Sequence, residues 1–267
     1  MSAHSENRGT LYLVPTPLDF GIAQDTPLPL AEWLPAETLA TARRLTHWIA
    51  ENAKSTRAFL KRVDALGGLA EPLQAQKITE LPRAAHKKGD HAPQAEGDAQ
   101  ARELLAPALL GHDIGLVSEA GMPAIADPGS SIVRAAHALG LRVVPLTGPI
   151  SLMLALAASG LNGQSFAFVG YVPQDTSERT RRLRELESLA LKTGQTQILI
   201  ETPYRNAALL QALLQTLHPH TRLAVCGALT LPQQVCRSAL VQDWKRKPPA
   251  LAGELPLEAP CVFLLGR

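Results

Sequence analysis

Short apolar runs alternate with longer amphipathic segments through the N-terminal half of the chain. Runs bounded by turn residues predict buried strands, and the segments between them predict helices. The predicted strands are Thr10–Val14, Trp48–Ala50, Asp113–Ser118 and Leu141–Leu146. The predicted helices lie within Ala36–Val63, on either side of Trp48–Ala50, at Ala101–Leu110, and at Ser130–Leu139, which Gly140 ends. Strands that alternate with helices favour a parallel sheet built of βαβ units.

The same alternation continues in the C-terminal half. The predicted strands are Phe166–Tyr171, Gln197–Glu201, Leu223–Ala228, Val235–Val241 and Cys261–Leu265. The predicted helices are Ser151–Ser159, Glu178–Leu191 and Asn206–Leu217. We expect Val235–Val241 to pair in the antiparallel sense. Thr147-Gly148-Pro149 has the composition of a hinge, so the chain is predicted to be an α/β protein with two domains, residues 1–147 and 148–267.

The alternation is interrupted between Pro82 and Gln100. This stretch is rich in Lys, His, Asp, Gln, Gly and Pro and has no apolar period. Such composition predicts a loop or mobile insert, at about residues 82–100, rather than an element of the core. With His86, Lys87, Lys88 and His91 it either closes over a substrate or is simply a disordered loop.

Composition narrows the possible partners only slightly. The formal net charge is +2 and aromatic residues make up 4% of the chain. The charge neither demands nor excludes a nucleic-acid partner, because binding depends on a local patch. The scarcity of aromatic residues argues against broad platforms that stack single-stranded bases.

Neither a metal site nor a membrane span is expected. Cys226, Cys236 and Cys261 form no CxxC pair, and with His218 and His220 their spacing fits no zinc finger or ribbon. No apolar run approaches the roughly 18 residues that cross a bilayer. An odd number of cysteines without a signal peptide predicts a protein of the reducing cytoplasm.

Candidate chemistry gathers where predicted strands end. Four strand ends run into turns that contain Gly, Pro or both: Val14–Leu18, Ser118–Gly129, Thr147–Ser151 and Glu201–Arg205. Gly permits close backbone approach and Pro stiffens a turn, so these segments either line a rigid pocket or simply turn the chain. The patterns of P-loop enzymes, dinucleotide-binding Rossmann folds, zinc proteases and serine hydrolases are absent.

Several of these segments resemble one family. SEAGMPAIADPG at 118–129 and RVVPLTGPISLMLALAASGL at 142–161 resemble the tetrapyrrole-methylase superfamily of S-adenosylmethionine-dependent enzymes. TLYLVPTPL, FAFVGYVPQ followed by RTRRLREL, and ETPYR extend the likeness to nearly the whole chain, apart from the N-terminal tail and the polar insert. Within the superfamily the chain is most similar to the branch of ribosomal small-subunit RNA methyltransferase I, which methylates a ribose 2′-hydroxyl.

The resemblance implies a fold and a cofactor site. It implies an N-terminal domain with a mostly parallel sheet and a C-terminal domain with a mixed sheet, S-adenosyl-L-methionine in the cleft between them, and a homodimer. By motif position, the implied cofactor contacts are Leu18, Gly121, Met122, Ile125, Ser151, Leu152, Ile200 and Ala228. Each apolar member of this set is also compatible with a place in the core.

The departures from the branch pattern lie on its substrate side. The branch reads ATPIGNLGD, EDTRxTxxLL and LTKxxEE. This chain has VPTPLDFGIAQ in place of the first, Glu51–Leu60 with Asn52 and Lys54 in place of the second, and Leu229–Val235 without acids in place of the third. The methyl donor is therefore better supported than the acceptor.

No residue can be singled out as the general base that methylation of a ribose hydroxyl would use. The candidates are Glu51, Lys54, Glu119 and Glu201, each of which also suits a solvated or helix-end charge. Two basic segments either contact phosphates or are solvated faces. They are the set Arg43, Arg44, Lys54, Arg57, Lys61 and Arg62, and the run Arg179–Arg182.

Three functions remain open. The first is an RNA methyltransferase that acts on a ribose 2′-hydroxyl of small-subunit ribosomal RNA, with ribosomal RNA or the small ribosomal subunit as its partner. The second is a methylase of a tetrapyrrole or another small molecule, which would need an open apolar cleft. The third is a protein that binds S-adenosylmethionine without catalysis, because acids of the branch pattern are missing.

Overall fold

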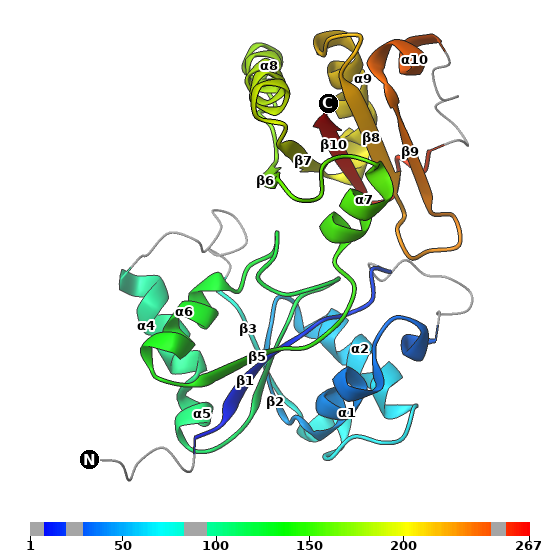
Figure 1. Ribbon diagram of the computed structural model, residues 1–267. Coiled ribbons are helices and arrows are strands. Elements are labelled where there is room, and N and C mark those ends of the chain that lie inside the picture. Colours follow the sequence, from blue (N-terminus) through cyan, green and yellow to red (C-terminus); the bar gives the residue numbers. More distant parts are fainter. Residues whose placement is uncertain (1–7, 20–28, 83–94, 247–254) are drawn as a thin grey trace. The chain divides into compact units, whose positions relative to one another are not determined.

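A parallel sheet of five strands forms the centre of the N-terminal half (Figure 1). The computed structural model describes residues 8–19, 29–82, 95–246 and 255–267, and the chain divides into two compact units, Met1–Pro149 and Ile150–Arg267. In sheet order the strands are β3 (Lys77–Glu80), β2 (His47–Ala50), β4 (Ile114–Val117), β1 (Thr10–Val14) and β5 (Arg142–Pro145). All four pairings are parallel, which confirms the sheet type predicted from the alternation of strands and helices.

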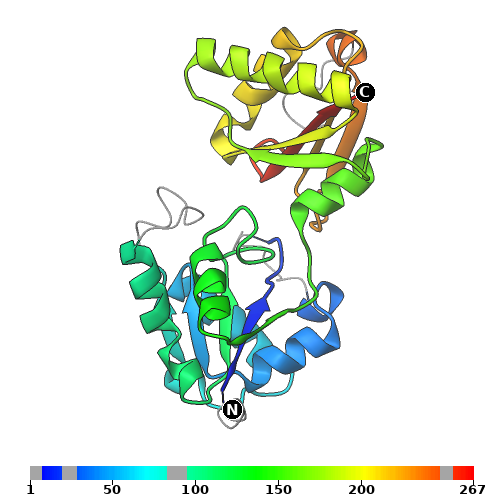
Figure 2. The same ribbon diagram turned by 60° about the vertical axis from the view of Figure 1, so that its left-hand side comes forward.

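Helices cover both faces of this sheet, as Figures 1 and 2 show. One face packs against α1 (Ala36–Arg44) and α2 (Ala53–Asp64). The other face packs against α4 (Ala95–Leu104), α5 (Ala106–Leu109) and α6 (Ser130–Ala138). Because successive side chains of a strand point to opposite faces, Trp48 lies in the first of these cores and Ile49 in the second. Burying side chains of this size stabilises the fold by roughly 1.5–3 kcal/mol each.

The first helix beyond the polar segment differs from the prediction. Residues 101–110 were expected to form one helix after a loop that ended at Gln100, whereas α4 begins at Ala95 and a separate short helix, α5, follows Leu105. Pro107 lies in the first turn of α5, where its missing N–H is tolerated, and it explains the break. Residues 83–94 of the predicted insert lie outside the described part of the chain.

The C-terminal unit is built on a mixed sheet, also of five strands. Its order is β6 (Phe166–Gly170), β7 (Thr196–Glu201), β10 (Cys261–Gly266), β8 (Arg222–Gly227) and β9 (Val235–Leu240). Strands β6 and β7 are parallel, and the other pairings are antiparallel. The expectation that the segment at 235–241 pairs in the antiparallel sense is confirmed, since β9 is antiparallel to β8.

Two sets of helices pack on this mixed sheet. Helices α8 (Thr176–Thr193), α9 (Asn206–Thr216) and α10 (Val241–Arg246) share one core with Leu199, Val225 and Phe263. Helix α7 (Ser151–Ser159) packs on β8, β9 and β10, and the thiol of Cys226 in β8 donates to the carbonyl of Ala155 at 3.8 Å. The observed α7 has the predicted bounds, because Gly160 in the left-handed region (φ +70°) ends it.

Five elements were not predicted. They are the edge strand β3, the helix α10 and the short 3-10 helices η1 (Leu30–Glu32), η2 (Leu73–Ala75) and η3 (Pro203–Arg205). The β3 sequence, KITE, has a single large apolar residue and is mostly exposed, so no apolar run marks it.

Within the described ranges, no helix combines the length and apolar character that crossing a membrane requires. The same residues contain no cluster of three or more His, Cys, Asp or Glu side chains arranged to hold a metal ion. Cys226 and Cys261 are buried free thiols, and Cys236 is an exposed one.

Candidate functional site

The turns that follow β1 and β4 are joined by a short backbone bridge. The Thr16 N–H donates to the Gly121 carbonyl at 3.0 Å, and the Gly121 N–H donates to the Thr16 carbonyl at 3.1 Å. Because β1 and β4 are parallel neighbours, their carboxyl ends lie at the same edge of the sheet, where ligands of α/β proteins bind. A Cβ placed on Gly121 would lie 3.0 Å from Cδ2 of the buried Leu18. Two predicted cofactor contacts, Leu18 and Gly121, are therefore packed against each other.

The turn after β5 closes on the same place. A Cβ on Gly148 would lie 2.3 Å from Cγ of Pro15, a distance that only glycine allows. The Pro149 carbonyl oxygen lies 3.5 Å from the position of a Cβ on Gly121. The Thr38 hydroxyl holds this turn from α1 by donating to the Thr147 carbonyl at 2.8 Å. Three of the four predicted strand-end turns thus converge within the N-terminal unit.

The loop between β4 and α6 has an unusual backbone. Gly121 and Gly129 have φ of +77° and +140°, and two alanines, Ala124 and Ala126, have φ of +63° and +67°. Left-handed backbone at a residue with a Cβ costs about 1–3 kcal/mol and persists only where the surroundings impose it. Such strain is concentrated at ligand-binding sites. Met122 and Ile125, two further predicted contacts, lie in this loop, and Ile125 is 40% exposed.

Three carboxyl groups gather beside this loop. Glu51 directly follows β2, its N–H donates to the Val117 carbonyl at 3.1 Å, and its Oε2 accepts from the Glu119 N–H at 3.1 Å. Burial, followed by the charges of Glu51 and Glu119, raises the pKa of Asp127 to about 7, against an opposing contribution from the Ser118 hydroxyl. Two of the four candidate bases, Glu51 and Glu119, are thereby brought together with Asp127.

Asp127 is a functional candidate that the sequence analysis missed. It belongs to the ADPG run at 126–129, which drew attention only as turn chemistry. A carboxyl group with a pKa near neutral is suited to exchange a proton at physiological pH, and perturbed values of this kind are concentrated at active sites. Burial and neighbouring charge are tertiary properties, so only the DPG motif itself carried a signal.

Asn52 and Lys54, which depart from the branch pattern, begin α2. The Asn52 side chain is the N-cap and accepts from the N–H groups of Lys54, at 2.8 Å, and Ser55, at 3.3 Å. Asparagine is as good a cap as aspartate, so the loss of the acid preserves the helix start. Lys54 is exposed in the first turn.

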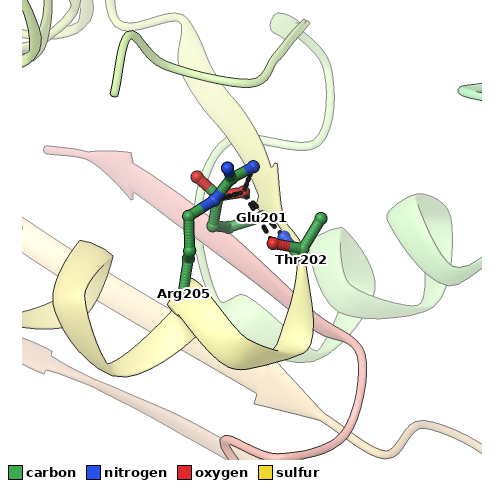
Figure 3. A network of polar contacts seen from close by, with 3 residues as sticks. All are labelled: Glu201, Thr202 and Arg205. Atoms are coloured by element: carbon green, nitrogen blue, oxygen red, sulfur yellow. Dashed lines mark hydrogen bonds and ion pairs between the residues drawn. The ribbon is translucent and has the colours of Figure 1, made fainter. Parts of the chain in front are cut away.

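Glu201, the fourth candidate base, is committed to a local network in the C-terminal unit (Figure 3). Its Oε1 accepts from the Thr202 N–H at 2.7 Å and from Nε and Nη2 of Arg205 at 2.9 and 2.7 Å. Only 6% of its side chain is exposed. Charge-assisted bonds of this kind hold the carboxylate in place against the guanidinium. This geometry argues against Glu201 as the general base and assigns it the positioning of Arg205.

Replacing Glu201 tests this role. We expect Glu201→Gln to lower the free energy of unfolding by about 1–3 kcal/mol, because the bonds to Arg205 lose the charge of the carboxylate in a largely buried place. Urea unfolding of the whole chain measures the change. The control is Glu185→Gln, whose carboxylate pairs with Arg181 and Arg182 on the surface of α8, and whose effect we expect to stay within about 0.5 kcal/mol. Equal effects of the two substitutions would contradict the assignment.

The remaining predicted contacts lie in the C-terminal unit. Ile200 near the end of β7 pairs with Val262 of β10, which lies between β7 and β8. Ala228 directly follows β8, has φ +52°, and donates its N–H to the Pro260 carbonyl at 3.1 Å. Because β7 and β8 run in the same direction, both residues lie at one edge of the sheet. Ser151 and the buried Leu152 form the first turn of α7.

Comparison with known proteins decides the family. The family model for tetrapyrrole (corrin/porphyrin) methylases matches residues 36–243, which is most of the chain. The chain belongs to this family. Tetrapyrrole methylases take their methyl group from S-adenosylmethionine, so the resemblance inferred from the motifs is confirmed.

Two relatives in the family are ribosomal RNA small subunit methyltransferases I. The protein from Halalkalibacterium halodurans is 29% identical over 84% of this chain and 66% of its own length. The protein from Xylella fastidiosa is 33% identical over 81% of this chain and 67% of its own length. The chain thus spans about two thirds of the length of these relatives.

The tetrapyrrole-methylase fold is also found in solved structures. The crystal structure of the methyltransferase CobJ matches with a TM-score of 0.54 and 17% identity, covering 97% of this chain and 94% of that one. At this identity the likeness supports the fold alone. A parallel sheet in the N-terminal unit and a mixed sheet in the C-terminal unit agree with the fold implied by the motifs.

One departure from the family branch has a structural explanation. In the segment that replaces LTKxxEE, Gln234 stands at the position of the first acid, and its Oε1 accepts from the Thr230 N–H at 3.1 Å. Thr230 has φ +70°, so this bond holds an unfavourable turn. An amide oxygen can accept this bond as a carboxylate can, so glutamine can hold the turn without a negative charge.

Proposed function

We propose that the chain is an S-adenosylmethionine-dependent methyltransferase that modifies a ribose 2′-hydroxyl of small-subunit ribosomal RNA. The observation that carries the proposal is the convergence of the turns after β1, β4 and β5 around Gly121. Membership of the tetrapyrrole-methylase family supports the cofactor. Relatives that are ribosomal RNA small subunit methyltransferases I support the acceptor.

The residues of the three turns fit the methionine part of this cofactor. Glycine or alanine stands at positions 121, 124, 126 and 148, so the turns present backbone rather than large side chains. A zwitterionic amino acid needs N–H donors for its carboxylate and carbonyl acceptors for its ammonium group, and irregular backbone at strand ends supplies both. The cofactor's position between the two units, which the resemblance implied, stays a prediction.

In the proposed reaction the cofactor supplies the methyl group and a carboxylate of the protein accepts the proton. When bound, S-adenosylmethionine supplies a methyl group that is already electrophilic, because it is attached to a sulfonium. The protein therefore chiefly has to position the acceptor hydroxyl and to take up its proton. Asp127, beside Glu51 and Glu119, is a carboxyl group with a pKa raised to about 7. We assign it the acceptance of the ribose hydroxyl proton, a role that contributes typically 10²–10⁴-fold. Orientation by the surrounding turns adds to this.

Methyl transfer to ribosomal particles tests the function. Purified protein is incubated with S-adenosylmethionine labelled in its methyl group and with small ribosomal subunits from a strain that lacks the gene. We expect label that RNase releases, that maps to a ribose 2′-oxygen, and that declines as salt rises. Label confined to protein would contradict the proposal.

The family name keeps a second acceptor class open, since its model is that of tetrapyrrole methylases. In the same experiment, label that resists RNase and enters an organic extract would favour a small-molecule acceptor. Cofactor binding without any transfer would favour the non-catalytic alternative. The homodimer, like the cytoplasmic location, remains a prediction, and light scattering of the purified chain measures the dimer directly.

A further inference from the structure

Two exposed tyrosines lie at one edge of the C-terminal sheet. Tyr171 directly follows β6, and Tyr204 lies in η3, which follows β7. Because β6 and β7 are parallel neighbours, their carboxyl ends share an edge. Tyr171 is 57% exposed and Tyr204 is 80% exposed. The chain has only three tyrosines, so this edge holds most of them.

A fixed guanidinium accompanies the two rings. The Arg205 Cζ lies 5.2 Å from the centre of the Tyr204 ring, and Figure 3 shows how Glu201 and Thr202 hold the network around it. The pKa of Arg205 is raised, first by its hydrogen bond to Glu201 and further by the phenols of Tyr204 and Tyr171. The Tyr204 ring lies beside the guanidinium, and Tyr171 follows the parallel neighbour of the strand that precedes Tyr204. Because Glu201 holds Arg205, the guanidinium loses little further freedom when a ligand binds.

Flat, exposed and cationic surfaces of this kind suit an unpaired base. Every base has a π-face that stacks on tyrosine or on a guanidinium plane, and RNA recognition relies on such contacts at splayed single-stranded positions. Helix α8 begins five residues after Tyr171 and carries arginines at 179, 181, 182 and 184. Positive charge near the phosphates that flank a stacked base favours RNA over an apolar partner.

We propose that Tyr171, Tyr204 and Arg205 form a stacking platform for an unpaired base of the RNA substrate. The inference rests on the proposed function, because that function supplies the RNA. The scarcity of aromatic residues argued against a broad platform for stacking single-stranded bases. At this edge, however, two of the few aromatic side chains are exposed, and one lies beside an arginine.

Alanine and phenylalanine substitutions test the platform. The probe is a single-stranded RNA oligonucleotide with one 2-aminopurine, whose fluorescence falls when the base stacks. We expect Tyr204→Ala and Tyr171→Ala each to weaken binding about 5- to 150-fold and to lessen the fluorescence change. Tyr204→Phe, which keeps the ring, should stay within about 2-fold of the wild type. Leu110→Ala, which removes another exposed side chain (77%) from the N-terminal unit, should have no effect.

Two further measurements separate the stacking platform from the proposed function. One is calorimetric titration with S-adenosylhomocysteine, and the other is transfer of a labelled methyl group to small ribosomal subunits. If the wild type methylates ribosomal RNA and the alanine variants bind and stack the oligonucleotide as it does, the platform is wrong and the function stands. If the wild type neither binds the oligonucleotide nor transfers label to RNA, both are wrong. If Tyr204→Ala weakens S-adenosylhomocysteine instead of RNA, the surface belongs to the cofactor and the inference is overturned.

Discussion

Gly121→Val is expected to weaken the binding of S-adenosylhomocysteine by about 100-fold or more, which corresponds to about 2.7 kcal/mol. Gly121 has φ +77°, a conformation that a β-branched residue adopts only under strain. The added Cβ would lie 3.0 Å from Leu18 Cδ2, and the further methyl groups would push Leu18 aside. Because the Thr16–Gly121 bridge joins two of the three turns, their separation would open the proposed seat. Calorimetric titration measures the loss.

Gly68→Val is the matched control for backbone strain. Gly68 also has a left-handed backbone (φ +81°), but no atom lies within 4 Å of the position of its Cβ. It lies beyond the end of α2, which begins beside the site and leads away from it. We expect this variant to lose some stability and to bind S-adenosylhomocysteine like the wild type. Wild-type affinity in Gly121→Val, or equal losses in both variants, would contradict the proposed seat.

Asp127→Asn is expected to change how stability depends on pH. The pKa of Asp127 rises from 3.8 to about 7 in the folded chain, so between these values the folded state holds a proton that the unfolded state has released. Stability from this group is therefore full below about pH 4 and is lost as the pH rises to about 7, by about 4 kcal/mol in all. Asparagine stays neutral throughout. Relative to the wild type, the variant should gain stability between pH 5 and pH 8.

Urea midpoints at the two pH values measure this difference. The control is Asp243→Asn, on the surface of α10, whose side chain is 47% exposed and pairs with Arg246. It should change stability little and equally at both pH values. If Asp127 accepts the ribose proton, Asp127→Asn also lowers methyl transfer by about 10²–10⁴-fold. A difference between Asp127→Asn and the wild type that is the same at pH 5 and pH 8 would show that Asp127 is not held in its neutral form.

Most of the fold could be predicted because its strands are short apolar runs between clear helix ends. Helix α7 is bounded by Pro149 and Gly160, and its observed limits match the predicted ones. Strand β3 was missed because an edge strand buries little and its residues are mostly polar. The start of α4 was missed because its first turns lie in polar sequence. Among residues 99–105, whose side chains the structure describes, Ala101 and Leu105 are the buried ones.

The sequence predicted where the candidate site lies, but it did not predict which groups are chemically active there. Gly121 and Gly148 signalled close backbone approach, and the structure shows Leu18 and Pro15 against them. Left-handed backbone at Ala124 and Ala126 carried no signal, because alanine rarely adopts it. The raised pKa of Asp127 depends on burial and on the charges of Glu119, in the same loop, and of Glu51, which lies far away in the sequence. Glu201 is a poor candidate because its carboxylate is engaged with Arg205. These are properties of the folded chain.

Hydrogen exchange, read by mass spectrometry with and without saturating S-adenosylhomocysteine, tests most directly whether the three turns form the cofactor seat. The account predicts slower exchange on binding in the peptides that cover residues 14–18, 118–129 and 146–149, and unchanged exchange in the second half of α8. A titration that shows binding by heat while exchange in all three turns stays the same would contradict it.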